Sequence, residues 1–234
     1  MSKVLGIIGG MGPLATVKLF EDIVLLTKAS KDQEHIHILI DNNTSIPDRT
    51  DYILGINTED PRKELIKSAL KLEEMGADYL VMPCNTAHSF YDQIVENISI
   101  PFLNMIEETA IYLKKQNPNI GKVGLLSTEG TIEAEVYDTI FKEYDIEVLK
   151  PSKGNQKYIT NLIYNIKEGI QEDNIKKVYR VIDDLKQENA EILIAGCTEI
   201  SVAVDMYNIE GIIDPMKILS KKAIEFAGKV AKKI

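Results

Sequence analysis

The sequence predicts an α/β fold built from two similar subdomains of Rossmann-like or flavodoxin-like type, whose parallel sheets are related by a pseudo-twofold axis. Two observations support this prediction. Short runs rich in Val, Ile and Leu alternate with amphipathic helical patterns along the chain, which is typical of a parallel sheet with right-handed helical crossovers. In addition, two pairs of segments repeat in the same order, which indicates two homologous halves.

Apolar runs predict the strands, because several are apolar at every position, as expected of strands covered on both faces. The N-terminal segment has a single lysine and a short apolar run. It lacks the long apolar region and cleavage site of a signal peptide, so this run is read as the first strand. The predicted strands are residues 4–8, 36–40, 79–82, 123–126 and 192–195.

Helices are predicted between these strands. Asp60 and Pro61 supply an N-cap and an early proline for one of them, and Gly76 follows it where a C-cap residue belongs. The predicted helices are residues 14–28, 62–75, 107–115, 133–143 and 174–189.

The internal repeat involves a glycine and a cysteine in each half. The segment 3-KVLGIIGGMG-12 resembles 122-KVGLLSTEG-130 when Gly6 is aligned with Gly124. The segment 76-GADYLVMPCNT-86 resembles 189-NAEILIAGCTE-199 when Cys84 is aligned with Cys197. Because the two alignments have similar offsets, the halves are predicted to have the same fold and nearly the same length.

Composition excludes several classes of function. The formal net charge of -9 argues against nonspecific binding to nucleic acid, whose phosphates would be repelled. No apolar run approaches the ~18 residues that a membrane span needs. Two cysteines far apart in a chain of ordinary globular composition are expected to be thiols, which predicts a cytoplasmic protein.

Both cysteines follow a predicted strand, and ligands of open parallel sheets bind at this end of the strands. A helix that begins beside each thiol would lower the pKa of the thiol. A single cysteine there is commonly a small core residue. A matched pair, one on each side of a cleft, suits the inversion of a stereocentre, in which one group removes a Cα proton and the other returns a proton to the opposite face.

Other roles for the two cysteines and their surroundings remain open at this point. A disulfide would require close Cα atoms, and a metal site would require further ligands, which His35, His37 and His88 do not supply at a suitable spacing. His88 lies one helical turn after Cys84 and could tune its surroundings. The segment 9-GGMGPLAT-16 lacks the spacing of a dinucleotide-binding or Walker motif, so it is read as a wall of a small-ligand cleft.

Three motifs together resemble the aspartate/glutamate racemase family: Met-Pro-Cys-Asn-Thr-Ala-His around Cys84, Gly-Cys-Thr-Glu around Cys197, and the opening Ile-Gly-Gly-Met-Gly-Pro. The resemblance covers essentially the whole chain. It implies a cofactor-independent amino-acid racemase, without pyridoxal phosphate or metal, in which Cys84 and Cys197 alternate as acid and base. It also implies a homodimer, with the active site in a cleft between residues 1–100 plus 208–234 and residues 101–207.

The glycine-rich opening is similar to the aspartate racemase branch, because glutamate racemases usually have Asp-Ser-Gly at this place. In that branch an arginine and a lysine hold the side-chain carboxylate of the substrate, which points to Arg49 and Lys167. Solvated surface charge is the alternative for both. The expected substrate-binding residues are Met11, Arg49, Asn85, Thr86, Thr128, Lys167, Thr198 and Glu199.

The predicted reaction is the interconversion of L-aspartate and D-aspartate, with glutamate as a second candidate substrate. One alternative is a related isomerase or racemase that acts on maleate or a hydantoin. The other is a non-catalytic sensor that only binds an amino acid.

Overall fold

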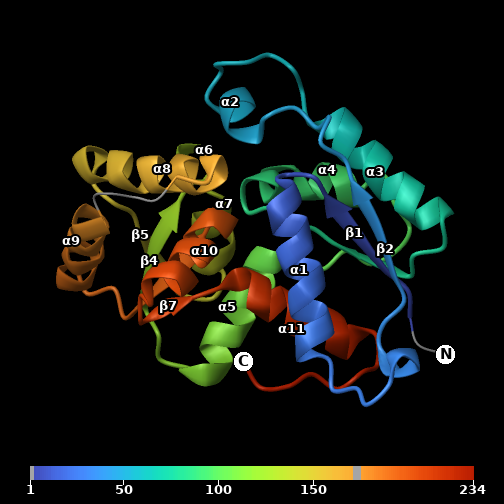
Figure 1. Cartoon of the computed structure of the whole chain (residues 1–234). Helices are drawn as coiled ribbons and strands as arrows, with labels where there is room; N and C mark the ends of the chain where they lie inside the picture. Colours follow the sequence, from blue (N-terminus) through green and yellow to red (C-terminus); the bar gives the residue numbers. More distant parts are fainter. Residues whose placement is uncertain (1–2, 171–174) are drawn as a thin grey trace.

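The computed structural model describes residues 3–170 and 175–234. It contains two α/β units side by side, one around β1 and β2 and the other around β4 and β5 (Figure 1). All strand pairs within the two sheets are parallel. The predicted fold class is therefore confirmed.

The first sheet has the strand order β2-β1-β3. Its strands are β1 (Leu5–Gly9), β2 (Ile38–Asn42) and β3 (Tyr79–Val81). The helices of this part of the chain are α1 (Pro13–Leu26), α2 (Arg49–Ile53), α3 (Arg62–Glu74) and α4 (Tyr91–Val95), with 3-10 helices η1 (Asp32–Glu34) and η2 (Thr86–Phe90).

The second sheet has the order β5-β4-β6-β7 and so repeats the arrangement of the first, with one strand added at the edge. Its strands are β4 (Lys122–Ser127), β5 (Glu147–Leu149), β6 (Ile192–Gly196) and β7 (Ile212–Ile213). The helices are α5 (Met105–Gln116), α6 (Glu129–Glu133), α7 (Val136–Lys142), α8 (Lys153–Glu168), α9 (Ile175–Gln187), α10 (Thr198–Tyr207) and α11 (Pro215–Phe226).

Several predicted boundaries were wrong for identifiable reasons. The predicted helix at residues 133–143 is two helices, because Glu135 adopts a left-handed conformation with φ 49° between α6 and α7. The strand predicted at residues 36–40 lies two residues later, since β2 is an edge strand and continues into the polar Asp41 and Asn42. The predicted first residue of the last helix, Asn174, lies outside the described residues.

The two halves share the same packing around their aligned glycines. A Cβ atom added to Gly6 would lie 2.5 Å from Cδ2 of Leu80, and one added to Gly124 would lie 2.4 Å from Cδ2 of Leu193. In each half a side chain on the first strand would displace a leucine of the neighbouring strand, which occupies the space beside the glycine. The internal repeat seen in the sequence corresponds to equivalent contacts in the structure.

The aligned acidic residues also have equivalent roles. The Asp78 carboxylate accepts the backbone N–H of Val4 at 2.6 Å. The Glu191 carboxylate accepts the N–H of Gly121 at 2.6 Å and that of Lys122 at 3.1 Å. Each carboxylate thus binds backbone donors at the start of the first strand of its own half, where the sheet leaves these groups unpaired.

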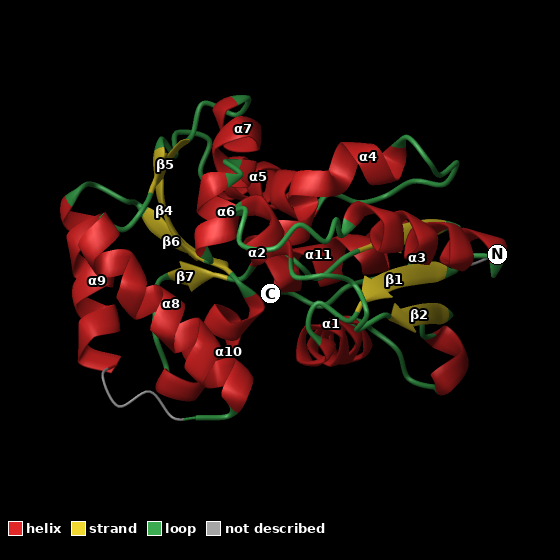
Figure 2. Ribbon diagram, turned by 90° about the horizontal axis from the view of Figure 1, so that it is seen from above, coloured by secondary structure: helices red, strands yellow, loops and turns green. Residues whose placement is uncertain are grey.

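The C-terminal segment contacts both halves. The Tyr79 hydroxyl donates to the carbonyl of Ala223 at 2.7 Å, and Thr27 forms an antiparallel bridge with Ala231. In contrast, β7 pairs with β6 in the second sheet, although it lies within residues 208–234. In Figure 2, α5 and α11 lie between the two sheets, and these two helices are in contact. The division of the chain at residues 100 and 207 remains a prediction.

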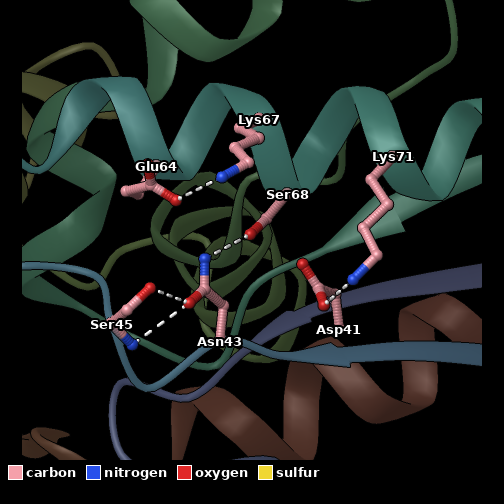
Figure 3. Close-up of polar contacts among 7 residues, drawn as sticks. All are labelled: Asp41, Asn43, Ser45, Glu64, Lys67, Ser68 and Lys71. Carbon is pink, nitrogen blue, oxygen red and sulfur yellow. Dashed lines mark hydrogen bonds and ion pairs between the residues drawn. The ribbon is translucent and has the colours of Figure 1, made fainter.

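The loop after β2 is fixed to α3 by polar side chains, which are drawn in Figure 3. The ammonium group of Lys71 lies 2.7 Å from the carboxylate of Asp41. The Asn43 amide donates to the Ser68 hydroxyl at 3.1 Å, and its oxygen accepts the hydroxyl of Ser45 at 2.6 Å. These contacts hold the start of the segment that carries α2 and Arg49.

Candidate active site

One small cavity brings the two cysteines together. All ten residues proposed from the sequence line it, and so do Asp48, Thr50 and Gly196, which sequence reasoning missed. The cavity volume is about 20 Å³, enough for about one water molecule. The site must therefore widen to admit an amino acid. Its lining residues are Met11, Asp48, Arg49, Thr50, Cys84, Asn85, Thr86, Thr128, Lys167, Gly196, Cys197, Thr198 and Glu199.

Cys84 is a buried free thiol in the loop between β3 and η2. The backbone of this loop is held by His88. Because Nε2 of His88 accepts the N–H of Met105 at 3.2 Å, Nδ1 carries the ring proton and donates it to the Cys84 carbonyl at 2.8 Å. Burial lowers the pKa of His88 to about 4, although the bond to Cys84 opposes this change. His88 is thus a neutral residue that forms hydrogen bonds to the backbone of both Cys84 and Met105.

The buried His88 predicts a dependence of stability on pH. Its pKa is about 4 in the folded state and about 6.5 in the unfolded state, so the unfolded state binds more protons between these values. Stability is therefore complete above pH 6.5 and is lost as the pH falls toward 4, by about 3 kcal/mol. Denaturant unfolding between pH 7 and pH 4 is expected to show a smaller loss in His88→Gln.

The exposed His37 offers the matched control, and His37→Gln should keep the loss of the unsubstituted protein. Equal pH dependence in His88→Gln and in the unsubstituted protein would contradict the assignment of a neutral, buried His88.

Cys197 is the N-cap residue of α10, and its thiol donates to Oε2 of Glu199 at 2.8 Å. The expectation that the helix N-terminus lowers the pKa of this thiol was wrong. Burial, followed by the charge and hydrogen bond of Glu199, raises the pKa of Cys197 well above its usual value, while Lys167 acts in the opposite direction. Cys197 is therefore a protonated thiol at neutral pH, and its proton points toward Glu199.

Lys167 lies in the last turn of α8 and lines the cavity, although much of its side chain is exposed. Partial desolvation of the ammonium group disfavours its charge, but the pKa of Lys167 is raised because the carboxylate of Glu199 attracts it. The ring centroid of Tyr164 lies 5.1 Å from the ammonium nitrogen. The cation thus belongs to the same cavity lining as Cys197 and Glu199.

Arg49 is the first residue of α2, which begins at the N-cap Asp48. One terminal nitrogen of Arg49 donates to the carbonyl of Pro47 at 3.2 Å. Its Nε is buried and has no hydrogen-bond partner among the described residues. An unpaired buried donor of a charged group is costly, so this N–H is available to an acceptor such as a ligand carboxylate.

Three threonine hydroxyls join the two halves beside the cavity. The Thr86 hydroxyl lies 3.0 Å from that of Thr128 and 2.8 Å from that of Thr131, and the latter two are 3.0 Å apart. Thr86 and Thr128 line the cavity, whereas Thr131 lies behind them and is fully buried. Thr131 was not proposed from the sequence, although it follows Thr128 by one helical turn.

Asn85 and Thr198 of the cavity lining form hydrogen bonds between the two halves. The oxygen of the Asn85 amide accepts the Tyr137 hydroxyl at 2.6 Å, so the amide N–H groups of Asn85 remain available as donors. Thr198 donates to the carbonyl of Pro83 at 3.4 Å, which links the two cysteine motifs directly. Met11 belongs to the loop between β1 and α1 and is almost fully buried at the cavity wall.

Two observations concern other kinds of site. Within residues 3–170 and 175–234, no group of three or more His, Cys, Asp or Glu side chains is arranged to hold a metal ion. Over the same residues, no helix has both the length and the apolar composition needed to cross a membrane.

Comparison with known proteins gives consistent results. The chain is 30% identical over 226 residues to the broad specificity amino-acid racemase RacX of Bacillus subtilis. The alignment covers 94% of this chain and 96% of RacX. Its structure resembles Picrophilus torridus aspartate racemase with a TM-score of 0.81 and 33% identity, over 99% of this chain and 96% of that one. Thermus thermophilus glutamate racemase shares the fold, with a TM-score of 0.66 and 20% identity, over 99% of this chain and 84% of that one.

A family model for Asp/Glu/hydantoin racemases matches residues 8–223, nearly the whole chain. The match includes both cysteine motifs, the loop with Arg49 and the helix with Lys167. The chain therefore belongs to the Asp/Glu/hydantoin racemase family, and its relatives are amino-acid racemases, which are isomerases.

Proposed function

We propose that this protein interconverts L-aspartate and D-aspartate without a cofactor, using Cys84 and Cys197 as its two acid/base groups. One observation carries the proposal: two cysteines from equivalent strand ends of the two halves line the same cavity as Arg49 and Lys167. Matched thiols suit a reaction whose two directions require the same chemistry from opposite faces, and the two cations suit a dicarboxylic substrate.

In the proposed mechanism one thiolate removes the Cα proton and becomes a thiol. The electron pair of the broken C–H bond stays on the substrate and delocalises into the α-carboxylate. The opposite thiol then donates its proton to the other face of Cα and becomes a thiolate. Because the thiol proton of Cys197 is hydrogen-bonded to Glu199, Cys197 is assigned as the acid of the first turnover, and Cys84 is assigned as its base.

The substrate carboxylates require separate donors. The side-chain carboxylate is assigned to Arg49 and Lys167, since the unpaired Nε of Arg49 offers a donor and Lys167 offers a second positive charge. The α-carboxylate is assigned to Asn85, Thr86 and Thr198, with Thr128 and Met11 at the wall. Donors around this carboxylate stabilise the charge that develops on it as the Cα proton leaves.

A panel of L- and D-amino acids tests the proposed reaction. Each would be incubated with the purified protein, and the enantiomers would be separated by chiral chromatography. We expect aspartate to be racemised in both directions, with glutamate slower. Stabilisation of the protein by an amino acid without any racemisation would instead support the sensor, and turnover of maleate or a hydantoin alone would support the related isomerase.

A second candidate is racemisation of a broader set of amino acids, because the relative from Bacillus subtilis has that activity in its name. The same panel separates the two. Comparable rates for aspartate and for amino acids without a side-chain carboxylate would favour the broader enzyme, since Arg49 and Lys167 would then contribute little to selection.

Glu199 is expected to set the pH range of the enzyme. Its charge and hydrogen bond contribute to the raised pKa of Cys197, so Glu199→Gln should lower this pKa. As an acid, Cys197 must be protonated, and as a base in the reverse reaction it must be ionised. The limb of the pH–rate profile that belongs to Cys197 should therefore move to lower pH for both directions of racemisation, as measured by kcat/KM.

Glu168→Gln at the exposed end of α8 is the control for Glu199→Gln. Superimposable profiles for Glu199→Gln and the unsubstituted enzyme would disprove this role.

We further propose a homodimer located in the cytoplasm. Helix α1 has an exposed apolar face, which favours an interface with a second copy. This face consists of Leu14, Val17, Phe20, Val24 and Leu25. Light scattering over a range of concentrations would measure the mass, and a single-chain mass throughout would contradict the dimer.

The proposed location in the cytoplasm is supported by the two cysteines. Both are free thiols, which suits a reducing compartment.

A further inference from the structure

The segment that carries Arg49 extends from the first half to the second. It begins at Asn43, which is fixed to α3 by Ser68 (Figure 3), and it leads to α2, which contacts α6 of the other half (Figure 1). The position of Arg49 relative to the two cysteines therefore depends on how closely α2 approaches α6.

At Gly130 of α6 the backbone of α2 leaves no room for a side chain. A Cβ atom at Gly130 would lie 2.7 Å from Cα of Thr50, 2.8 Å from its Oγ1 and 3.0 Å from its Cβ. The first of these atoms belongs to the backbone, so rotation of a side chain cannot relieve the overlap. Any side chain at residue 130 must displace α2 or α6.

The displaced element is expected to be α2. Helix α6 is held by Thr128, its N-cap, which accepts the N–H of Thr131 at 3.2 Å. The hydroxyls of both residues are also bound to Thr86 of the first half. Helix α2 has the same length as α6 but contains no buried residue, whereas Gly130 and Thr131 of α6 are buried, so less packing resists the movement of α2.

The backbone of Gly130 itself does not require glycine. It lies within a helix and has no positive φ. An alanine there would by itself favour the helix. The absence of a side chain is thus explained by the contact with Thr50 and not by the conformation of α6.

We propose that Gly130 is a positioning residue that lets α2 close onto the second half and so places Arg49 against the side-chain carboxylate of the substrate. This inference rests on the proposed binding of a dicarboxylate in the cavity. Gly130 does not touch the substrate and acts through Thr50 and its neighbour Arg49.

Gly130→Ala tests the proposal, with Gly154→Ala as its matched control. Gly154 lies in α8, and a Cβ added there would meet no atom within 4 Å. Binding of succinate, a dicarboxylate that cannot be racemised, would be measured by calorimetry. We expect Gly130→Ala to weaken binding at least tenfold and to raise KM for aspartate similarly, with a smaller change in kcat. Gly154→Ala should behave like the unsubstituted protein.

A double substitution separates positioning of Arg49 from a general structural effect. If Gly130 acts through Arg49, Gly130→Ala should weaken succinate binding little further when Arg49→Ala is already present. Affinity within twofold of the unsubstituted protein in Gly130→Ala would overturn the proposal, and so would equal weakening with and without Arg49. Racemisation that fails while succinate still binds would refute the proposed function and leave the role of Gly130 intact.

Discussion

Cys84→Ser and Cys197→Ser are each expected to lower the rate of aspartate racemisation by roughly 10²–10⁴-fold in both directions, the range that general acid–base catalysis contributes. A serine hydroxyl is far less acidic than a thiol, so it neither forms the base nor donates a proton at neutral pH. The rates from L-aspartate and from D-aspartate should both fall in each variant, because every turnover uses one group as the base and the other as the acid. Initial rates from each pure enantiomer, followed by chiral chromatography, measure the effect.

Succinate affinity and thermal unfolding are the controls for these two variants, and both should remain close to those of the unsubstituted protein, since the hydroxyl occupies nearly the same space as the thiol. Full racemisation by both variants would rule out the two-thiol mechanism. Loss in only one variant would leave a single acid/base group and would also contradict the proposal.

Arg49→Ala is expected to lower kcat/KM for aspartate by roughly 10–100-fold, because hydrogen bonds to charged groups contribute about 1.5–3 kcal/mol. The loss should be smaller for an amino acid without a side-chain carboxylate. Arg180→Ala is the control, since Arg180 is exposed in α9 and does not line the cavity. Steady-state kinetics on both substrates give the comparison. An unchanged KM for aspartate in Arg49→Ala would favour another substrate.

The strands of the core could be predicted from the sequence because burial on both faces leaves an uninterrupted apolar run. The ends of β1, β3, β4 and β6 lie within one residue of the prediction. In contrast, β5 and β7 have only three and two residues, too few to show a pattern. Their strand conformation depends on pairing with β4 and β6, which the local sequence does not contain.

The candidate site could be predicted to the extent that its residues occur in the repeated motifs or in the family pattern. Thr50 and Asp48 were missed because they line the cavity only through the approach of α2 to the other half. This approach brings Thr50 close to Gly130, which is 80 positions later in the sequence. The pKa of Cys197 was predicted with the wrong sign, since the helix N-terminus was considered without burial and the carboxylate of Glu199.

The two half-sites are similar but not equivalent. Glu199 has Thr86 as its counterpart, and among the residues that the structure describes a carboxylate accepts a hydrogen bond from the thiol of Cys197 but not from that of Cys84. The Cys197 thiol is therefore held in a defined hydrogen bond, although the strand framework on both sides of the cavity is the same. In the proposed mechanism, this asymmetry would let two similar halves provide one acid and one base at the start of a turnover.

Deuterium exchange at Cα tests the two-base mechanism most directly. L-aspartate would be incubated with the enzyme in deuterated water, and both enantiomers would be analysed by mass spectrometry at low conversion. With separate groups on the two faces, each new D-aspartate should carry one deuterium at Cα, while the remaining L-aspartate stays unlabelled; D-aspartate as the starting enantiomer should give the converse. Product that keeps the original proton, or equal labelling of both enantiomers at low conversion, would contradict the mechanism.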